Sequence, residues 1–392
     1  MFNTLSLEQL RQRGTLKWTT FDQDVLPLWV AETDFDTCPA VVESVQNAVN
    51  LQQFGYPSNS NKLADALTAW CATRYNWEIN PAWVHDLPDV LKGIEVSINH
   101  FTVAGSAIIL PTPAYMPFYD VLEVTGRKIN QVPMIFEDGR YSFDLVAIEE
   151  AFANGAGGLI VCNPYNPLGA TFTAEELQSL AQLAQKYEAR IISDEIHAPL
   201  TLDEAHIPTA SVSDTAAEVT ITITATSKGW NTPGLKCAQL ILHNERDEKT
   251  WKKINSLRSH GASTLGIAAS IGAYEKGGEW LDTEIEYLRK NRQFLLDNLG
   301  QAIPGIGFNK PQATYLAWLD FSEVEGLNDQ DPAAYLLEHA RVALNPGLPF
   351  GPGGENHARL NFGTSQEILE EFLDRTRTAF SSSPTKNEFI YL

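Results

Sequence analysis

The sequence predicts an α/β fold, in which a mainly parallel mixed sheet is flanked by helices and accompanied by a smaller α+β domain. Short apolar strand-like runs recur along the first two thirds of the chain, separated by helical stretches of about 10 to 15 residues. Parallel strands need such crossovers, so both faces of the sheet should be covered. The 392 residues suffice for one large domain and a smaller one.

Individual elements carry local signals of their own. Ser6 and Gln9 form a capping-box pattern before a first helix, and Thr173 and Glu176 form another before a helix that ends at Tyr187. The other helices expected from periodicity lie at 40–50, 61–75, from about 115, 143–152, 265–276 and 280–299. The expected strands lie at 107–110, 128–133, 158–162, 190–193 and 219–224.

These elements suggest a division of the chain into domains. Residues 51–285 hold the repeated strands and helices, and we expect them to form the large domain. Residues 286–392 read as a separate α+β unit, to which the N-terminal segment 1–50 should contribute.

Composition excludes several classes of function. The formal net charge is −21 and the sequence pI is about 4.7, which disfavours binding to nucleic acids or to anionic membrane surfaces. The four cysteines are far apart and the eight histidines have no metal-binding spacing, so we expect buried thiols and no metal. Because no apolar signal or membrane-spanning stretch occurs, a cytoplasmic location is expected.

Polar residues follow several of the expected strands directly. Asn163 follows the strand at 158–162, Asp194 follows the strand at 190–193, and Ser227 and Lys228 come shortly after 219–224. In parallel sheets the ligand lies beyond the carboxyl ends of the strands. A lysine at that edge, with hydroxyls and a glycine beside it, suits covalent capture of a carbonyl cofactor and its phosphate.

This ordered set, together with Arg359, resembles the class I/II aminotransferase superfamily of fold-type I enzymes, which use pyridoxal 5′-phosphate. The resemblance covers nearly the whole chain and implies an aspartate-aminotransferase-like large domain. Finer features resemble the MalY/PatB-type carbon–sulfur lyases, also called cystathionine β-lyases. They are 13–15 with Lys17 and Trp18, the segment 29–35 and Asp194-Glu195-Ile196-His197. That family usually has Asp and Met where Glu32 and Thr33 stand, a difference that concerns substrate identity more than reaction type.

The resemblance assigns catalytic roles. Lys228 would bind the cofactor aldehyde covalently and, once displaced by a substrate amine, would remove the Cα proton. Asp194 would keep the pyridine nitrogen protonated, and Asn163 would hydrogen-bond the phenolic oxygen and contact the substrate. Tyr115 would stack on the ring and protonate a departing sulfur. His197 stands where aminotransferases commonly have tyrosine, so it either donates to the phenolic oxygen or packs nearby.

The remaining roles concern the phosphate and the substrate. The backbone N–H groups of Gly93 and Ile94, the Ser227 hydroxyl and the Lys236 ammonium would hold the phosphate. Tyr56 would reach the phosphate and the substrate from a neighbouring subunit, so that the active site exists only in a homodimer. The guanidinium of Arg359 would bind the substrate α-carboxylate, and Ala31 would also line the substrate site.

Several of these residues also have interpretations without a catalytic role. Asp194 has the position of a helix N-cap, Asn163 that of a turn residue before proline, and Tyr115 that of a core tyrosine. The segment around Tyr56 fits an ordinary turn, and Arg359 fits a surface position on an alternating strand.

The function that the resemblance implies is pyridoxal-phosphate-dependent β-elimination from an L-amino acid with sulfur at Cβ. Cystathionine or another S-substituted cysteine would give a thiol, pyruvate and ammonia. An aminotransferase with the same fold and cofactor is the nearest alternative, and His197 and the segment 29–35 favour the lyase. A second alternative is a regulatory binding protein that keeps the cofactor pocket, although no segment marks a surface for a partner.

Overall fold

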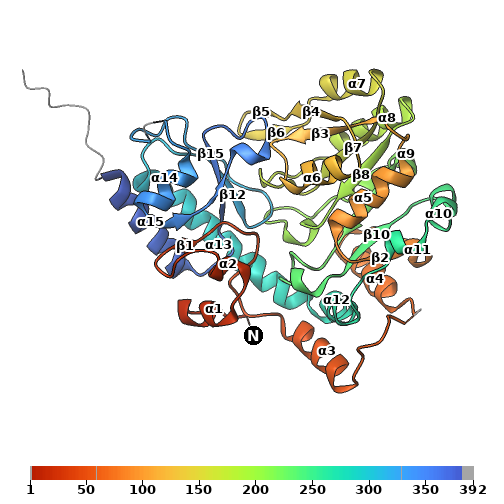
Figure 1. Cartoon of the computed structure of the whole chain (residues 1–392), viewed down its shortest axis with the longest axis horizontal. Helices are drawn as coiled ribbons and strands as arrows, with labels where there is room; N and C mark the ends of the chain where they lie inside the picture. Colours follow the sequence, from red (N-terminus) through yellow and green to blue (C-terminus); the bar gives the residue numbers. More distant parts are fainter. Residues whose placement is uncertain (1, 59, 328, 382–392) are drawn as a thin grey trace, which may run out of the picture. The chain divides into compact units, whose positions relative to one another are not determined.

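The computed structural model describes residues 2–58, 60–327 and 329–381, and they group into two compact units (Figure 1). The first unit consists of Phe2 with the described residues of Asp36–Glu286 and Pro311–Thr314. The second consists of Asn3–Phe35, Tyr287–Lys310 and the described residues from Tyr315 onward.

The first unit contains a seven-stranded sheet with the strand order β2-β10-β9-β8-β7-β3-β4. The strands from β9 to β4 pair in parallel, whereas β10 runs antiparallel to β2 and to β9. The bounds are β2 (Val84–Leu87), β3 (Ala107–Thr112), β4 (Ile129–Pro133), β7 (Ala156–Cys162), β8 (Arg190–Asp194), β9 (Thr220–Thr224) and β10 (Ala238–Ile241). The predicted fold class, a mainly parallel mixed sheet flanked by helices, is confirmed.

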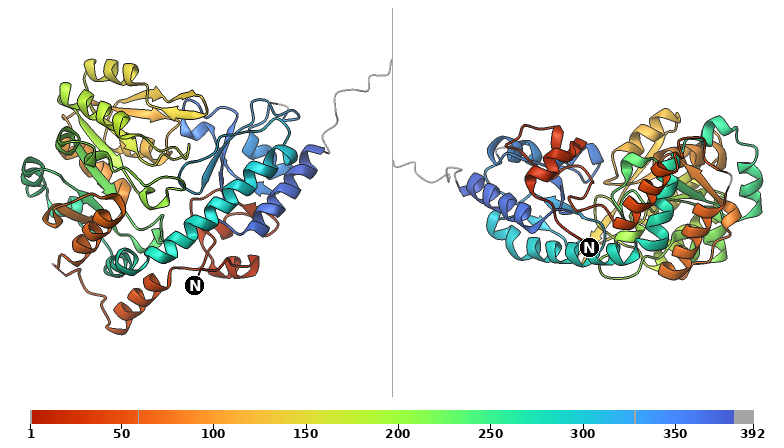
Figure 2. Two further views of the ribbon diagram at one scale, coloured as in Figure 1. Left: turned by 180° about the vertical axis from the view of Figure 1, so that it is seen from behind. Right: turned by 90° about the horizontal axis from the view of Figure 1, so that it is seen from below.

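Helices pack on this sheet and on one another. Helix α5 packs on β8, β9 and β10, α7 packs on β7, and α8 packs on β8, while α3, α4 and α12 form a separate group (Figure 2). The bounds are α3 (Pro39–Asn50), α4 (Lys62–Tyr75), α5 (Val90–Phe101), α6 (Pro117–Val124), α7 (Leu145–Ala153), α8 (Ala174–Lys186), α9 (Asp214–Val219), α10 (Glu245–Trp251), α11 (Ser256–Ser259) and α12 (Thr264–Lys276).

The central strands are buried along their whole length, which explains their sequences. Every residue of β7, β8 and β9 is buried, as expected for parallel strands that are covered on both faces. The two predicted capping boxes, at Ser6 and Thr173, are confirmed. A hairpin of β5 (Ile135–Glu137) and β6 (Arg140–Ser142) is an element that we did not predict.

The second unit is built around an antiparallel sheet with the order β11-β12-β15-β14. A parallel pair joins β1 to β13, so that the N-terminal segment and the C-terminal part share this unit. The bounds are α1 (Leu7–Arg13), α2 (Leu16–Thr19), β1 (Leu26–Pro27), β11 (Gly307–Phe308), β12 (Leu316–Asp320), α14 (Pro332–His339), β13 (Val342–Ala343), β14 (Asn345–Pro346), β15 (His357–Asn361) and α15 (Gln366–Ser381).

Helix α13 (Gly278–Ala302) begins in the first unit and continues into the second. Helix α3, which we assign from sequence to the N-terminal segment of the small domain, packs on α12 within the first unit. The predicted domain boundaries at residues 50 and 285 stay predictions. In the described parts of the chain, no helix combines the length and the apolar character needed to cross a bilayer.

Candidate functional site

Asn163 and Asp194 lie side by side at the carboxyl ends of the central strands. Asp194 is the last residue of β8, and in the sheet register it pairs with Cys162 of β7 and with Ile223 of β9. Asn163 directly follows β7, and its backbone N–H donates to the Asp194 carbonyl at 2.9 Å. Both side chains are buried, with exposed fractions of 2% and 3%. The structure thus brings these two predicted residues together where ligands bind in such sheets.

The Asp194 carboxyl group is undercompensated, because nearby positive charge and hydrogen bonds offset only part of the effect of its burial on its pKa. Burial raises its pKa to about 7, and the nearby charge of Glu195 acts in the same direction. A hydrogen bond from the Ile196 N–H, at 3.1 Å, and the charge of Lys228 lower it only in part. A cationic group beside Asp194 would therefore favour its ionised form. Asp194 accepts within a turn and is not the N-cap residue of the next helix, which is His197.

Lys228 lies in a turn that is anchored on both sides. The turn follows β9, and within it the Trp230 N–H donates to the Thr226 carbonyl at 3.0 Å. Trp230 is fully buried, and its indole N–H donates to the Gly277 carbonyl at 3.2 Å. Lys228 and Ser227 are half-buried, so neither side chain projects freely into solvent. The charge of Lys228 acts on Asp194, as its effect on the pKa of that residue shows.

The N-terminus of α5 and Lys236 form a second group. Asp89 is the N-cap residue, and its Oδ1 accepts from the Lys92 N–H at 2.9 Å. The Lys236 ammonium lies 3.1 Å from Asp89 Oδ2, with both side chains substantially exposed. The N–H groups of Val90 and Leu91, in the first turn, have no carbonyl partner within the helix. Together with the helix dipole and Lys236, they suit an anion such as a phosphate.

The predicted helix start at Gly93 is wrong, whereas the contact of the Gly93 and Ile94 N–H groups with a phosphate stays a prediction. Helix α5 begins at Val90, and the Gly93 N–H already donates to the Asp89 carbonyl at 3.2 Å. Ile94 comes one position further into the helix. Gly93 also has a packing role, because a Cβ there would lie 2.8 Å from Cγ2 of Ile223. The Asp89 capping position was the sequence signal that we missed.

Tyr115 and His197 also come shortly after strands of the sheet. Tyr115 lies three residues beyond β3, is half-buried, and makes an edge contact with Phe118 at 5.5 Å between ring centroids. It is therefore not a fully buried core tyrosine. His197 is 2% exposed, and its carbonyl accepts from the Leu200 N–H at 2.9 Å. Their predicted roles toward a cofactor stay predictions.

Tyr56 differs from the other predicted residues of the first unit, because its side chain is fully exposed. It lies between α3 and α4, where the Thr264 hydroxyl donates to the Gly55 carbonyl at 2.8 Å. Tyr56 lines an open cavity of about 610 Å³ with residues of α3, α4 and α12, among them Asn47, Lys62 and Ile267. Within its own chain, Tyr56 is not packed against the residues at the strand ends.

Arg359 lies in the second unit on β15. It is 2% exposed, so it does not occupy the surface position that an alternating strand allows. Its Nη2 donates to the Trp29 carbonyl at 3.1 Å and to Oδ1 of Asn345 at 2.6 Å. The guanidinium also lies over the Phe350 ring, 5.2 Å from its centroid. A buried guanidinium held by these contacts is oriented to bind a carboxylate.

The segment 29–35, which contains Ala31, is held by buried contacts within the second unit. The Lys17 ammonium lies 2.7 Å from Oδ2 of Asp34, and the Trp18 indole N–H donates to Oδ1 at 2.8 Å. The Ala31 carbonyl accepts from the Tyr315 hydroxyl at 3.0 Å. From sequence, Lys17, Trp18 and Asp34 belong to a family pattern and have no predicted role. The structure shows that they position this segment.

The two residues that depart from the family pattern make different contacts. The Glu32 carbonyl accepts from Lys17 at 3.1 Å and from Asn361 at 2.7 Å, so its backbone is fixed whatever its side chain does. The Thr33 side chain is 3% exposed. The four cysteines are free and buried. Among the described residues, no group of His, Cys, Asp and Glu side chains could hold a metal ion.

Comparisons with known proteins agree with this arrangement. Residues 23–375 match the family model "Aminotransferase class I and II". The chain is 48% identical to a cystathionine beta-lyase of Corynebacterium glutamicum over 94% of this chain and 97% of the relative. It is 36% identical to the cystathionine beta-lyase PatB of Bacillus subtilis, over 91% and 93%. A crystal structure from Corynebacterium diphtheriae, presented as a candidate PLP-dependent beta-cystathionase, is 44% identical with a TM-score of 0.94, covering 98% and 100%.

Proposed function

The chain belongs to the aminotransferase class I and II family, and on this basis we propose that it is a pyridoxal-phosphate-dependent carbon–sulfur β-lyase. Cystathionine or a related S-substituted L-cysteine, with one water, would give a thiol, pyruvate and ammonia. The relatives that are cystathionine β-lyases support this reaction, and so does the predicted resemblance to their type, which the comparisons confirm. The observation that carries the proposal is the buried carboxyl group of Asp194, whose burial is only partly compensated by the charge of Lys228.

The described residues fit this cofactor at three separate points. The primary amine of Lys228 suits its aldehyde, and Asp194 suits a protonated pyridine nitrogen, which supplies the missing positive charge. The first turn of α5, with Lys236 and Ser227, suits its phosphate. When bound, the cofactor withdraws electrons from the substrate Cα and so makes its proton acidic.

The chain's own residues would then manage protons and orientation. Lys228 would accept the proton from Cα, since its amine becomes free once the substrate amine has replaced it. Asp194 would hold a proton on the ring nitrogen as a charged hydrogen-bond acceptor. Tyr115 would donate a proton to the sulfur that leaves Cβ. Arg359 would bind the substrate carboxylate with its two-pronged guanidinium, and Ala31 would line the substrate site.

The test of this function is incubation of the purified, cofactor-loaded protein with cystathionine in the absence of any keto acid. A lyase releases pyruvate and a thiol steadily, in equal amounts and over many turnovers. An aminotransferase instead converts its cofactor once to the aminated form and stops, and this result would overturn the proposal. A panel of S-substituted cysteines then ranks the substrates by kcat/KM.

We also propose a homodimer with shared active sites. Large apolar side chains of α3 and of the segment that follows it are exposed: Val42, Val49, Leu51, Phe54 and Tyr56. Such an exposed cluster is typical of a protein–protein contact. A mixture of Lys228→Ala and Tyr56→Ala proteins tests whether the active sites are shared. Each mixed dimer would contain one site without either change. Under isologous pairing, such sites make up about a quarter of all sites. Recovered activity in the mixture supports the dimer, and its absence, when mixed dimers have formed, contradicts shared sites.

A further inference from the structure

The turn that carries Lys228 is closed by two backbone hydrogen bonds. The Trp230 N–H donates to the Thr226 carbonyl at 3.0 Å, and the Thr232 N–H donates to the Ser227 carbonyl at 3.1 Å. In the sequence, Lys228 lies between the donor and the acceptor of each bond. The position of its backbone therefore depends on Thr226 and Trp230, the two residues that end the first of these loops.

Side chains attach both ends of this turn to helix α12. The hydroxyl oxygens of Thr226 and Ser270 are 2.9 Å apart, and both residues are buried. At the other end, the Trp230 indole N–H donates at 3.2 Å to the carbonyl of Gly277, the C-cap residue of α12. The indole can come this close because Gly277 has no side chain, since a Cβ there would lie 2.4 Å from Nε1.

The two attachment points lie on the same side of α12. Ser270 and Gly277 are seven residues apart, which corresponds to about two turns of an α-helix and a rise of about 10 Å. A single hydrogen bond would let the turn rotate about that bond, whereas two separated bonds fix both its position and its direction. Because Lys228 lies between the attached ends, the direction in which its side chain leaves the backbone is fixed relative to α12.

We propose that Trp230 is a positioning residue for the Lys228 amine, and that it acts by attaching the turn to α12. This inference rests on the proposed function, in which the same amine binds the cofactor and then accepts the Cα proton. Proton transfer depends steeply on geometry, and a displacement of about 1 Å can lower a rate about a hundredfold. A turn that keeps only the Ser270 attachment would let the amine adopt many positions, of which few suit the transfer.

The indole hydrogen bond can be removed while the surrounding structure keeps its other contacts. The Gly277 carbonyl also accepts from the Leu281 N–H at 3.1 Å, so it still has a partner when the indole is replaced. Trp230→Phe retains an aromatic ring beside Trp70 and Tyr274, whose ring centroids lie 5.1 and 5.7 Å from that of Trp230. This substitution therefore tests the hydrogen bond more than the packing.

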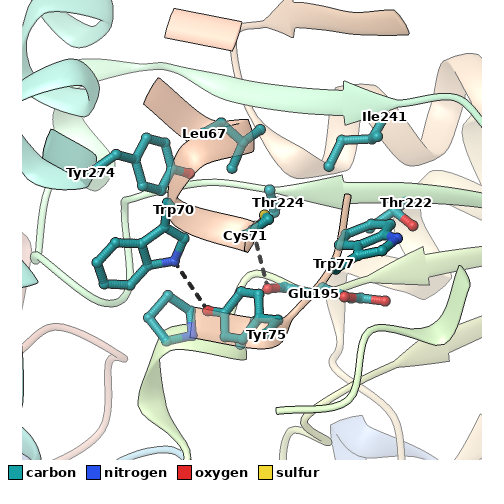
Figure 3. Close-up of a pocket in the computed structure, with 12 residues that line it drawn as sticks. Leu67, Trp70, Cys71, Tyr75, Trp77, Glu195, Thr222, Thr224, Ile241 and Tyr274 are labelled. Atoms are coloured by element: carbon teal, nitrogen blue, oxygen red, sulfur yellow. Dashed lines mark hydrogen bonds between the residues drawn. The ribbon is translucent and has the colours of Figure 1, made fainter. Parts of the chain in front are cut away.

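Trp70 provides the matched control, because it belongs to the same aromatic cluster. Its indole N–H donates to the Tyr75 hydroxyl at 3.3 Å, and both residues lie on α4 (Figure 3). Trp70→Phe therefore also removes one indole donor from a buried tryptophan of this cluster. The bond that it breaks lies within α4 and does not attach the Lys228 turn to α12.

Three measurements separate positioning from stability. Hydrogen–deuterium exchange of the segment 225–232 in the cofactor-free protein reports how firmly the turn is held. Initial rates of thiol release from cystathionine, at saturating pyridoxal phosphate, give kcat and KM. Melting of the cofactor-free proteins gives the structural effect of each substitution.

We expect Trp230→Phe to exchange faster than the wild type in this segment, and its kcat to fall about tenfold while KM stays within about twofold. Trp70→Phe should leave exchange and kcat unchanged, even if it lowers the melting temperature. Ser270→Ala, which removes the other attachment, should change both in the same direction and provides the test if Trp230→Phe does not fold. A kcat of the folded variants that falls no further than that of Trp70→Phe would overturn the inference. A wild-type protein that binds no cofactor would instead refute the proposed function.

Discussion

The two ends of strand β8 bury charged groups in opposite ways. At the amino end, Arg190 donates to the two carboxylate oxygens of Asp247 at 2.9 and 2.5 Å, and its Nε donates to the Val219 carbonyl at 3.0 Å. At the carboxyl end, Asp194 is equally buried but accepts a hydrogen bond from the backbone of Ile196 at 3.1 Å. One end holds a closed ion pair and the other an acid with weak compensation.

The pKa shifts of the two carboxyl groups express this difference. Burial alone would raise the pKa of Asp247, but the hydrogen bond and charge of Arg190 outweigh it and hold that pKa below its usual value. Burial raises the pKa of Asp194 to about 7. A compensated pair stabilises the fold, whereas an undercompensated acid is set to receive a ligand. In this molecule the fully compensated carboxylate serves the fold, and the partly compensated carboxylate is the one predicted to meet a ligand.

The largest expected effect concerns the carboxyl end. Lys228→Ala removes both the amine that binds the cofactor and the base, so kcat/KM for thiol release should fall by at least about a thousandfold. Cofactor absorbance after borohydride treatment should no longer remain with the protein. Lys236→Ala is the control, because this exposed lysine should weaken cofactor binding while kcat at saturating cofactor is largely kept. Substantial elimination by Lys228→Ala would show that another group is the base.

At the amino end, a change should damage the fold and leave the chemistry intact. Asp247→Asn leaves the Arg190 guanidinium without its carboxylate, which should lower the free energy of unfolding by about 3–5 kcal/mol. Denaturant titration measures this loss, and kcat of the folded fraction should stay within about twofold. A large fall in kcat with unchanged stability would remove the distinction between the two ends.

The smallest effect is a pH dependence of stability that differs in sign between the ends. For Asp194, folding raises the pKa from 3.8 to about 7, so its contribution to stability is present below about pH 4 and is lost as the pH rises through 7. Asp194→Asn should therefore make the cofactor-free protein more stable at pH 8, by up to roughly 4 kcal/mol, although it abolishes most activity. For Asp247, whose pKa is lowered, the contribution is instead lost as the pH falls.

Thermal melts of the cofactor-free wild type and Asp194→Asn between pH 4 and 8 measure this difference. Comparing the two proteins cancels the general effect of the acidic surface. A gap that closes toward pH 4 fits the raised pKa, and a constant gap would contradict it. Added pyridoxal phosphate should stabilise the wild type more than the variant, because the ring cation meets Asp194 only there.

The central part of the fold could be predicted because its signals are local. Strands β7, β8 and β9 each contain apolar or β-branched residues in succession, and the cap of helix α8 is visible in the sequence. The strands β2 and β10 were missed, since β2 reads Val-His-Asp-Leu and takes its place only by pairing with β10. Their antiparallel pairing depends on contacts far apart in the chain, which periodicity does not report.

The residues of the candidate site likewise divide into those that local sequence signals reveal and those that only folding brings together. Asn163, Asp194 and Lys228 could be found because each follows a strand that the sequence reveals. The start of α5 was placed three residues too late, at Gly93 instead of Val90, because its Asp89 cap was not recognised. The pairs Arg190–Asp247 and His206–Glu195 lie 57 and 11 residues apart and form only in the folded chain. Sequence patterns gave no sign of either.

Gly93 acts as a spacer between two chemical groups. The absence of a side chain at this position lets α5 lie directly on Ile223, a residue of the strand that leads to Lys228. The distance from the start of α5 to that lysine is therefore set by the contact of the Gly93 backbone with the Ile223 side chain. A single added carbon at position 93 would lengthen the interval that one cofactor molecule has to span, from its phosphate to its aldehyde.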